Sequence, residues 1–219
     1  MELFPEVASA SGRLTVLASP YFGRRHVAIH AREFVKAHPD VQLSFNLTNE
    51  YIDPVREEYD LCIRIGNVID PNFVASKLLT NRRVVCATPA YFRKYGIPQK
   101  LEDLERHNCL GVSLVGGIHR DWLFQESGKL VSVKINGKVD CSDGETLVRW
   151  VKDGICLAWR STWEVGALIA SGDLVTALDE FALPSFDITA VYPRQRPLPA
   201  VKLFIETLKT AYAKPGYWS

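Results

Sequence analysis

The sequence predicts an α/β fold of two lobes, and three observations support this prediction. Strand-like and helix-like apolar patterns alternate in the N-terminal part of the chain, and they alternate again in the C-terminal part. A stretch of short strands and turn signals, residues 109–142, lies between these two parts. Hydrophobic residues make up 47% and charged residues 23% of the 219 residues, which is the composition of a globular protein with a sizeable core. We expect the chain to cross between the lobes near residue 88 and to return near residue 189.

The N-terminal part is typical of an open α/β sheet. A strand over 12–19 leads through the turn "PYFG" into a helix that Pro39 ends. The apolar residues of this helix recur on one face, as an inward stripe requires: Val27, Ala31, Phe34 and Val35. Further strands are expected over 41–47, 59–66, 73–79 and 83–88. The order strand, helix, strand predicts a right-handed crossover between neighbouring parallel strands.

Helix and turn signals delimit the middle of the chain. A helix over 89–96 is expected to end at Gly96, with Pro98 just beyond it. The pairs Ser127-Gly128 and Asn136-Gly137 predict tight turns between short strands.

The C-terminal part repeats the strand and helix pattern. The stretch "SDGE" fits a capping box, in which the Ser142 hydroxyl caps a helix that runs to Gly154. A buried strand over 155–159, a helix closed by Gly172 and a strand over 186–193 are expected to follow. The last helix carries apolar residues on one face: Val201, Phe204, Ile205, Leu208 and Tyr212.

Charge and cysteine content exclude several classes of protein. The formal net charge of +1 provides no general attraction to nucleic acid, so this chain alone is a poor candidate for DNA contact. No apolar run is long enough to span a bilayer and the N-terminus lacks the pattern of a signal peptide, so we expect a cytoplasmic protein with no membrane partner. The five cysteines are widely spaced without a CxxC pair, which indicates reduced core thiols rather than a disulfide framework or a zinc site.

One charged residue interrupts a buried strand pattern. In "YDLCIRIG" apolar residues surround Arg64, and burial of an unpaired guanidinium is costly. Ligands of open α/β sheets bind outside the carboxyl ends of the strands. Because Arg64 stands at such an end, next to Gly66, we expect it to face a water-accessible cleft.

The order of several segments along residues 12 to 213 is more specific than any single motif. The segments are "GRLTVLASPYFG", "FVKAHPDVQLSFNL", "EEYDLCIRIG", "VVCATPAYFRKYGIP", "LEDLERHNCL", "GDLVTAL" and "AVYPRQRPLPAVKLFIETL". In this order they resemble the effector-binding domain of LysR-type transcriptional regulators. The resemblance implies a type 2 periplasmic-binding-protein-like fold, in which two Rossmann-like lobes are joined by a hinge of two crossing strands. Lobe I would consist of residues 12–88 and 189–219, and lobe II of residues 89–188.

The resemblance also implies the partners of the chain. Members of the family carry an N-terminal winged helix-turn-helix, which is absent from this chain, and a linker helix, of which residues 1–11 would be a remnant. We therefore expect a regulatory domain that binds a small-molecule effector, contacts DNA only through the absent domain, and needs no cofactor or metal. We expect it to form a homodimer or tetramer, for which Ile29, on the outward face of its helix, is the candidate interface residue.

By family analogy, residues from both lobes line the effector cleft. The candidates in the first lobe are Ser19, Tyr21, Phe22, Arg64 and Gly66. The candidates in the second lobe are Ser113, Ser142, Trp159 and Arg160. Two guanidiniums that approach one ligand from opposite walls suit a carboxylate, and the aromatic side chains suit a ring or an alkyl part. The expected effector is therefore a small anion.

The residues leave alternatives for these candidates. Ser19 can equally well serve its own turn and contact no ligand. Either arginine can be engaged by a structural carboxylate, for which the candidates are Asp60, Asp143 and Glu164.

Two other functions share the expected fold. One is a solute-binding protein of a transport system, and the other is an enzyme. Catalytic signals are weak, because "GVSLV" lacks the second glycine of a nucleophile elbow. His26 and His30 lie one helical turn apart without the glutamate of an HExxH metal motif. We therefore expect no enzymatic activity.

Overall fold

A computed structural model describes residues 11–49, 59–66, 71–112, 121–195 and 198–218. The chain forms two compact units. Unit 1 contains the described residues up to Leu79 and then Ile188–Lys214, and unit 2 contains Thr80–Asp187 and the described residues after Lys214. The first crossing thus precedes the position near residue 88 that the sequence suggested, because strand β5 (Arg83–Ala87) pairs with β10 (Ala158–Ser161) and β11 (Val175–Ala177) of unit 2.

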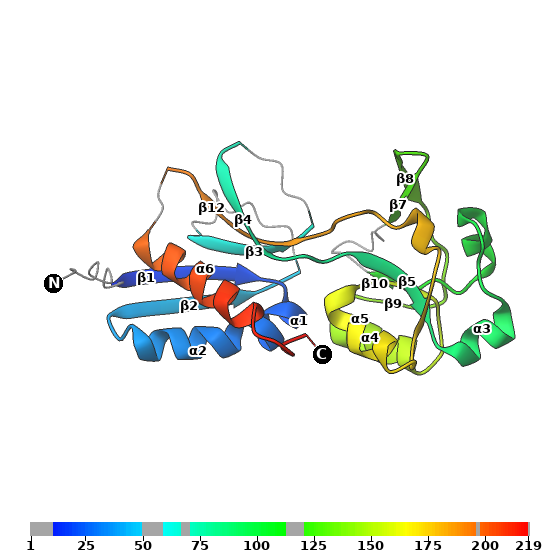
Figure 1. The fold of residues 1–219 in the computed structure, drawn as a ribbon, viewed down its shortest axis with the longest axis horizontal. Helices are drawn as coiled ribbons and strands as arrows, with labels where there is room; N and C mark the ends of the chain where they lie inside the picture. The colour runs from blue at the N-terminus through cyan, green and yellow to red at the C-terminus, as the bar shows by residue number, and fades with distance from the viewer. Residues whose placement is uncertain (1–10, 50–58, 67–70, 113–120, 196–197, 219) are drawn as a thin grey trace. The chain divides into compact units, whose positions relative to one another are not determined.

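Unit 1 is built on a five-stranded sheet with the strand order β2-β1-β3-β12-β4 (Figure 1). Its strands are β1 Gly12–Ala18, β2 Val41–Leu47, β3 Leu61–Ile65, β4 Phe73–Leu79 and β12 Ile188–Pro193. Strand β1 runs parallel to β2 and β3, whereas β12 runs antiparallel to β3 and β4. All five strands were predicted, with ends that differ by two residues or fewer.

The helix after β1 was predicted as one piece, and it contains a π-helical turn. Its parts are α1 Pro20–Phe22, the π turn η1 Gly23–Val27 and α2 Ala28–Ala37. The Tyr212 hydroxyl donates a 2.8 Å hydrogen bond to the carbonyl of His26, within the irregular turn. Tyr212 ends helix α6 (Pro199–Tyr212), which packs against α2 through Phe34 and Phe204, with ring centroids 5.1 Å apart.

Unit 2 repeats the strand arrangement of unit 1. Its strands are β5, β6 Gly111–Val112, β7 Trp122–Glu126, β8 Lys129–Val133, β9 Asp140–Cys141, β10 Ala158–Ser161 and β11 Val175–Ala177. A parallel bridge between Cys109 and Leu157 joins the β6-β9 pair to the β10-β5-β11 sheet, so five strands follow one another as β9-β6-β10-β5-β11. Two parallel pairings are followed by two antiparallel ones, as in unit 1. The two Rossmann-like lobes are thereby confirmed.

Three helices of unit 2 end close to the glycines that the sequence predicted as their ends. The helices of this unit are α3 Pro89–Tyr95, η2 Leu101–Arg106, α4 Gly144–Lys152, α5 Thr162–Ala170 and η3 Asp179–Phe181. Gly96, Gly154 and Gly172 follow α3, α4 and α5 with φ angles of 84°, 69° and 79°. This left-handed conformation is favoured by glycine, because other residues carry a Cβ that clashes there.

One of the two predicted turn pairs forms a hairpin turn. Ser127 and Gly128 connect β7 to β8, and their φ angles of 48° and 78° are both positive, as a type I′ turn requires. The pair Asn136-Gly137 was wrongly predicted as such a turn. Strand β9 pairs with β6 instead of β8, and the Asn136 carbonyl accepts a hydrogen bond from the Cys109 amide.

All five cysteines are free thiols. Burial raises the pKa of Cys62, Cys86, Cys109 and Cys156 to about 12, so these thiols are protonated at neutral pH and form part of the core. In the part of the chain that the structure describes, no helix combines the length and apolar character needed to cross a membrane.

Candidate ligand-binding site

Polar residues gather at one edge of the unit 1 sheet. Strands β1 and β3 are parallel neighbours in which Ala18 lies opposite Ile63, so Ser19, directly after β1, and Arg64, near the end of β3, lie at the same edge. Ser19 has an extended backbone and its side chain makes no capping hydrogen bond to the helix that follows. Gly66 is buried with a φ of 104°, which turns the chain away after β3. The edge therefore brings together a hydroxyl, the start of a helix and a half-buried guanidinium.

Asp60, one of the carboxylates that the sequence offered as a partner for an arginine, binds Thr15. Its Oδ2 accepts hydrogen bonds from the Thr15 amide at 2.7 Å and from the Thr15 hydroxyl at 2.6 Å. The Asp60 amide in turn donates to the Thr15 carbonyl at 3.1 Å. Asp60 thus ties β1 to the start of β3.

The two aromatic candidates of unit 1 belong to its core. Phe22 has no exposed surface and packs against the rings of His26 and Tyr212, with centroids 5.2 and 6.3 Å away. Tyr21 is 8% exposed, and the Arg25 guanidinium lies 5.6 Å from its ring centroid. Phe22, which the sequence offered as an apolar surface for a ligand ring, is therefore covered by its packing against His26 and Tyr212.

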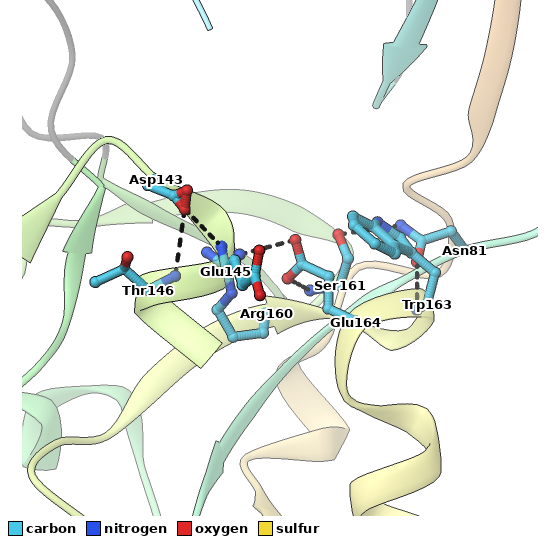
Figure 2. Close-up of polar contacts among 8 residues, drawn as sticks. All are labelled: Asn81, Asp143, Glu145, Thr146, Arg160, Ser161, Trp163 and Glu164. Atoms are coloured by element: carbon cyan, nitrogen blue, oxygen red, sulfur yellow. Dashed lines mark hydrogen bonds and ion pairs between the residues drawn. The ribbon is translucent and has the colours of Figure 1, made fainter. Parts of the chain in front are cut away.

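A second edge of this kind lies in unit 2. Strands β9, β6 and β10 run parallel, so helices α4 and α5, which follow β9 and β10, begin at the same edge, about 10 Å apart at the usual strand spacing. Val112 ends β6 between them, and the next residue, Ser113, lies outside the described residues. Figure 2 shows the polar contacts of both first helical turns.

The cap of α4 is Asp143 and not Ser142, so the predicted capping box is wrong. The Asp143 carboxylate accepts hydrogen bonds from the amides of Glu145 at 3.1 Å and Thr146 at 3.3 Å (Figure 2). Asp143 directly precedes the first helical residue and has an extended backbone, which is the geometry of an N-cap. Ser142 is exposed and lies one residue too early to take this role.

Arg160 is engaged by Glu164, one of the carboxylates that the sequence left open. Its Nη2 lies 2.7 Å from Glu164 Oε1, and the two side chains are 7% and 8% exposed (Figure 2). Glu164 Oε2 also accepts a hydrogen bond from the Ser161 amide at 3.3 Å. The Arg160 Nε–H is buried and has no acceptor in the described part of the chain. The positive charge of Arg160 is therefore already compensated.

Trp159 and Arg160, both candidates for ligand contact, point to opposite faces of β10. They are successive residues of β10, and successive strand residues point to opposite faces of a sheet. Trp159 packs against Trp122 of the β7-β8 hairpin with ring centroids 6.5 Å apart and against Phe186 at 6.0 Å. The Arg83 guanidinium lies 4.4 Å from the Trp159 ring centroid. Trp159 is thus a core residue, 5% exposed.

Among the residues described, no three His, Cys, Asp or Glu side chains are grouped as a metal ion requires. The helical pair His26 and His30 packs instead against aromatic rings, with His30 5.7 Å from the ring centroid of Tyr212.

Sequence reasoning missed the buried polar residue Asn81, which is 1% exposed. It follows the first crossing between the units and its amide contacts the first turn of α5 (Figure 2). Its partners lie 80 to 106 residues away along the chain, so no local pattern could have identified it.

Two units with one strand order, each with polar residues at the carboxyl edge of its parallel strands, define a two-lobed protein of the type that binds small molecules. The chain belongs to the family of the LysR substrate binding domain, whose model matches residues 8–213. This is a family of transcriptional regulators.

Named relatives and solved structures agree with this membership. The HTH-type transcriptional activator TtdR of Escherichia coli K12 is 36% identical over 181 residues, which are 83% of this chain and 58% of the relative. The HTH-type transcriptional regulator DmlR of the same strain is 35% identical over 204 residues, 93% of this chain and 66% of the relative. The chain thus spans less than two thirds of the length of these relatives.

Among solved structures, the regulatory domain of CrgA from Neisseria meningitidis is similar with a TM-score of 0.71 and 27% identity, covering 91% of this chain and 98% of that one. The regulatory domain of AphB from Vibrio vulnificus, at 22% identity, has a TM-score of 0.68 and covers 92% of this chain and 99% of that one, and it supports the fold alone.

Proposed function

We propose that this chain is the effector-sensing part of a transcriptional regulator, and that its effector carries an anionic group bound at the unit 1 edge by Ser19 and Arg64. The observation that carries the proposal is the register of β1 and β3, which brings a hydroxyl, a helix start and a guanidinium to one strand edge. Helix starts and guanidiniums both favour anions. In unit 2 the Arg160 charge is compensated by Glu164, so the proposed anion site consists of unit 1 residues.

The remaining properties follow from the regulator function. DNA is contacted by a separate domain, because the near-neutral charge of this chain releases few counterions on binding DNA. The chain performs no catalysis, needs no cofactor and acts in the cytoplasm, where a regulator meets its operator. Transport of a solute is the second function of this fold, and the transcriptional-activator relative argues against it.

The anion proposal predicts a loss of carboxylate binding in Arg64→Ala. A panel of acetate, succinate, citrate and benzoate is titrated by calorimetry, with succinamide and benzamide as uncharged controls. We expect at least one carboxylate to bind in preference to its amide, and Arg64→Ala to weaken it by about tenfold to a hundredfold, since a charge-assisted pair is lost.

Two further variants distinguish the contributions of Arg64 and Arg160 to carboxylate affinity. Arg64→Lys keeps the charge and removes only the paired donors, so its loss is expected to be smaller. The double variant Arg160→Met/Glu164→Leu removes the unit 2 ion pair as a whole, and unchanged carboxylate affinity is expected in it. A tenfold loss of carboxylate affinity in the double variant would support the hypothesis that both arginines bind the effector. Preferential binding of the amides would contradict an anionic effector.

We also propose that the chain self-associates through α2. Ile29 is 49% exposed on this helix, on the face away from the Phe34 and Phe204 contact. Sedimentation velocity is expected to find a dimer or tetramer of the wild type, and Ile29→Asp is expected to shift it toward the monomer, because a charge in an apolar interface is costly. Glu33→Gln, at an exposed position on the same helix, is the control. An unchanged oligomer in Ile29→Asp would remove this residue from the interface.

A further inference from the structure

Asn81 connects the first turn of α5 to other parts of unit 2 through a single side chain. Its Oδ1 accepts a hydrogen bond from the Thr162 hydroxyl at 3.0 Å. It also accepts one from the Trp163 amide at 3.4 Å (Figure 2). Its Nδ2 donates to the Phe186 carbonyl at 2.9 Å and to the Ser161 hydroxyl at 3.4 Å. Both halves of the buried amide are therefore engaged, and a fully satisfied buried network of this kind is rigid.

The same residue holds both chain crossings together. Asn81 stands two residues after Leu79, the last residue of unit 1 before the first crossing, and Asp187 is the last residue before the second. The Phe186 amide donates to the Asn81 carbonyl at 2.7 Å, and the Asn81 amide donates to Asp187 Oδ1 at 3.2 Å. The two crossings therefore enter unit 2 as one hydrogen-bonded piece.

The second crossing continues directly into the strand that pairs with Arg64. After Asp187 the chain enters β12, in which Ile188 lies opposite Ile65 and Thr189 lies opposite Arg64. On the other side of β12 the register with β4 shifts between Ile188 and Thr189, which places a bulge next to the crossing. Bulges bend a strand locally and are frequent next to functional sites.

We propose that Asn81 is a positioning residue that couples the first turn of α5, with the Arg160–Glu164 pair, to the two chain crossings and through β12 to Arg64. In the regulator that we propose above, this coupling transmits an effector contact at either strand edge to the segments that join the units. A chain of contacts is not in itself a coupling energy, so the coupling is tested as an interaction between two substitutions.

The first test needs no ligand. Thr162→Val removes the hydroxyl that donates to Asn81, and hydrogen exchange is followed at the amides of residues 186–188 in the full chain. We expect Thr162→Val to accelerate this exchange by about tenfold when Asn81 is present, and by less than about twofold in an Asn81→Ala background. Equal acceleration in both backgrounds, or none with Asn81 present, overturns the proposal.

Two variants guard against a merely structural effect. Thr88→Val removes the hydroxyl that caps α3, which accepts a hydrogen bond from the Tyr91 amide at 3.1 Å. Once any change in global stability is subtracted, this variant is expected to leave the exchange rates of the amides of residues 186–188 unchanged. Asn81→Asp keeps the acceptor for Trp163 and loses the donor to Phe186. It is expected to accelerate exchange at residues 186–188 and not at Trp163, and the reverse result contradicts the proposed path.

The second test uses whichever of acetate, succinate, citrate or benzoate binds. The carboxylate is expected to protect the amides of 162–164 and of 186–188 in the wild type, but only one of these segments in Asn81→Ala. Protection of both segments in Asn81→Ala overturns the coupling. Absence of binding by every carboxylate refutes the anionic effector and leaves the ligand-free test to decide the role of Asn81.

Discussion

Removal of the Glu164 carboxylate by Glu164→Ala is expected to lower the free energy of unfolding by about 3–5 kcal/mol. The reason is that Arg160 is 6% exposed and would keep its charge in the core of unit 2 without its partner at 2.7 Å. The Ser161 amide would also lose an acceptor at the start of α5. Urea denaturation followed by the fluorescence of the tryptophans measures this change.

Replacing both members of the pair tests whether this loss of stability comes from an unpaired charge. If the cost comes from an unpaired buried charge, Arg160→Met/Glu164→Leu is much less destabilised than Glu164→Ala, because apolar residues of similar volume often replace a buried ion pair with little loss. If the double variant lost as much free energy of unfolding as Arg160→Met and Glu164→Leu lose together, this explanation would be contradicted. The exposed pair of Arg149 and Glu145, 3.7 Å apart, is the control, and Glu145→Ala is expected to cost less than about 1 kcal/mol.

The predictable part of the fold was encoded in local patterns. Strand β2 has the predicted bounds because its side chains alternate within the segment, and the segment alone carries that signal. Glycines after helices were equally informative, since the positive φ at Gly96 and Gly172 is a local requirement. The π turn after β1 left no such mark, because π turns have no distinctive sequence.

The placement of the candidate site residues could be predicted only where it follows from their position along the chain. Ser19 and Arg64 meet at one edge because parallel strands end together, and strand order alone supplies that result. The sequence could not tell which face of β10 Trp159 takes and which face Arg160 takes, because β10 is buried on both faces and apolarity does not distinguish them. The choice of Asp143 over Ser142 as a cap was open, since both residue types are good N-caps and they are adjacent.

Gly137→Ala is expected to lower the free energy of unfolding by about 2–4 kcal/mol. An added Cβ would lie 1.9 Å from the carbonyl oxygen of Cys109 and 2.9 Å from its carbonyl carbon. Because the obstructing atoms belong to the backbone, no side-chain rotation relieves the overlap. The shift would break the hydrogen bond from the Cys109 amide to the Asn136 carbonyl and that from the Lys138 amide to Asn108 Oδ1.

The matched control is Gly166→Ala, in the middle of α5, where an added Cβ meets no atom within 4 Å. Alanine has the higher helix propensity and fewer unfolded conformations, so this variant is expected to be more stable than the wild type by about 0.5–1 kcal/mol. Thermal and urea unfolding of the two variants side by side therefore give changes of opposite sign. A loss at Gly137 no larger than about 0.5 kcal/mol, the usual limit for surface substitutions, would mean that the chain around Cys109 relaxes freely. Gly137 would then be a loop residue without a packing requirement.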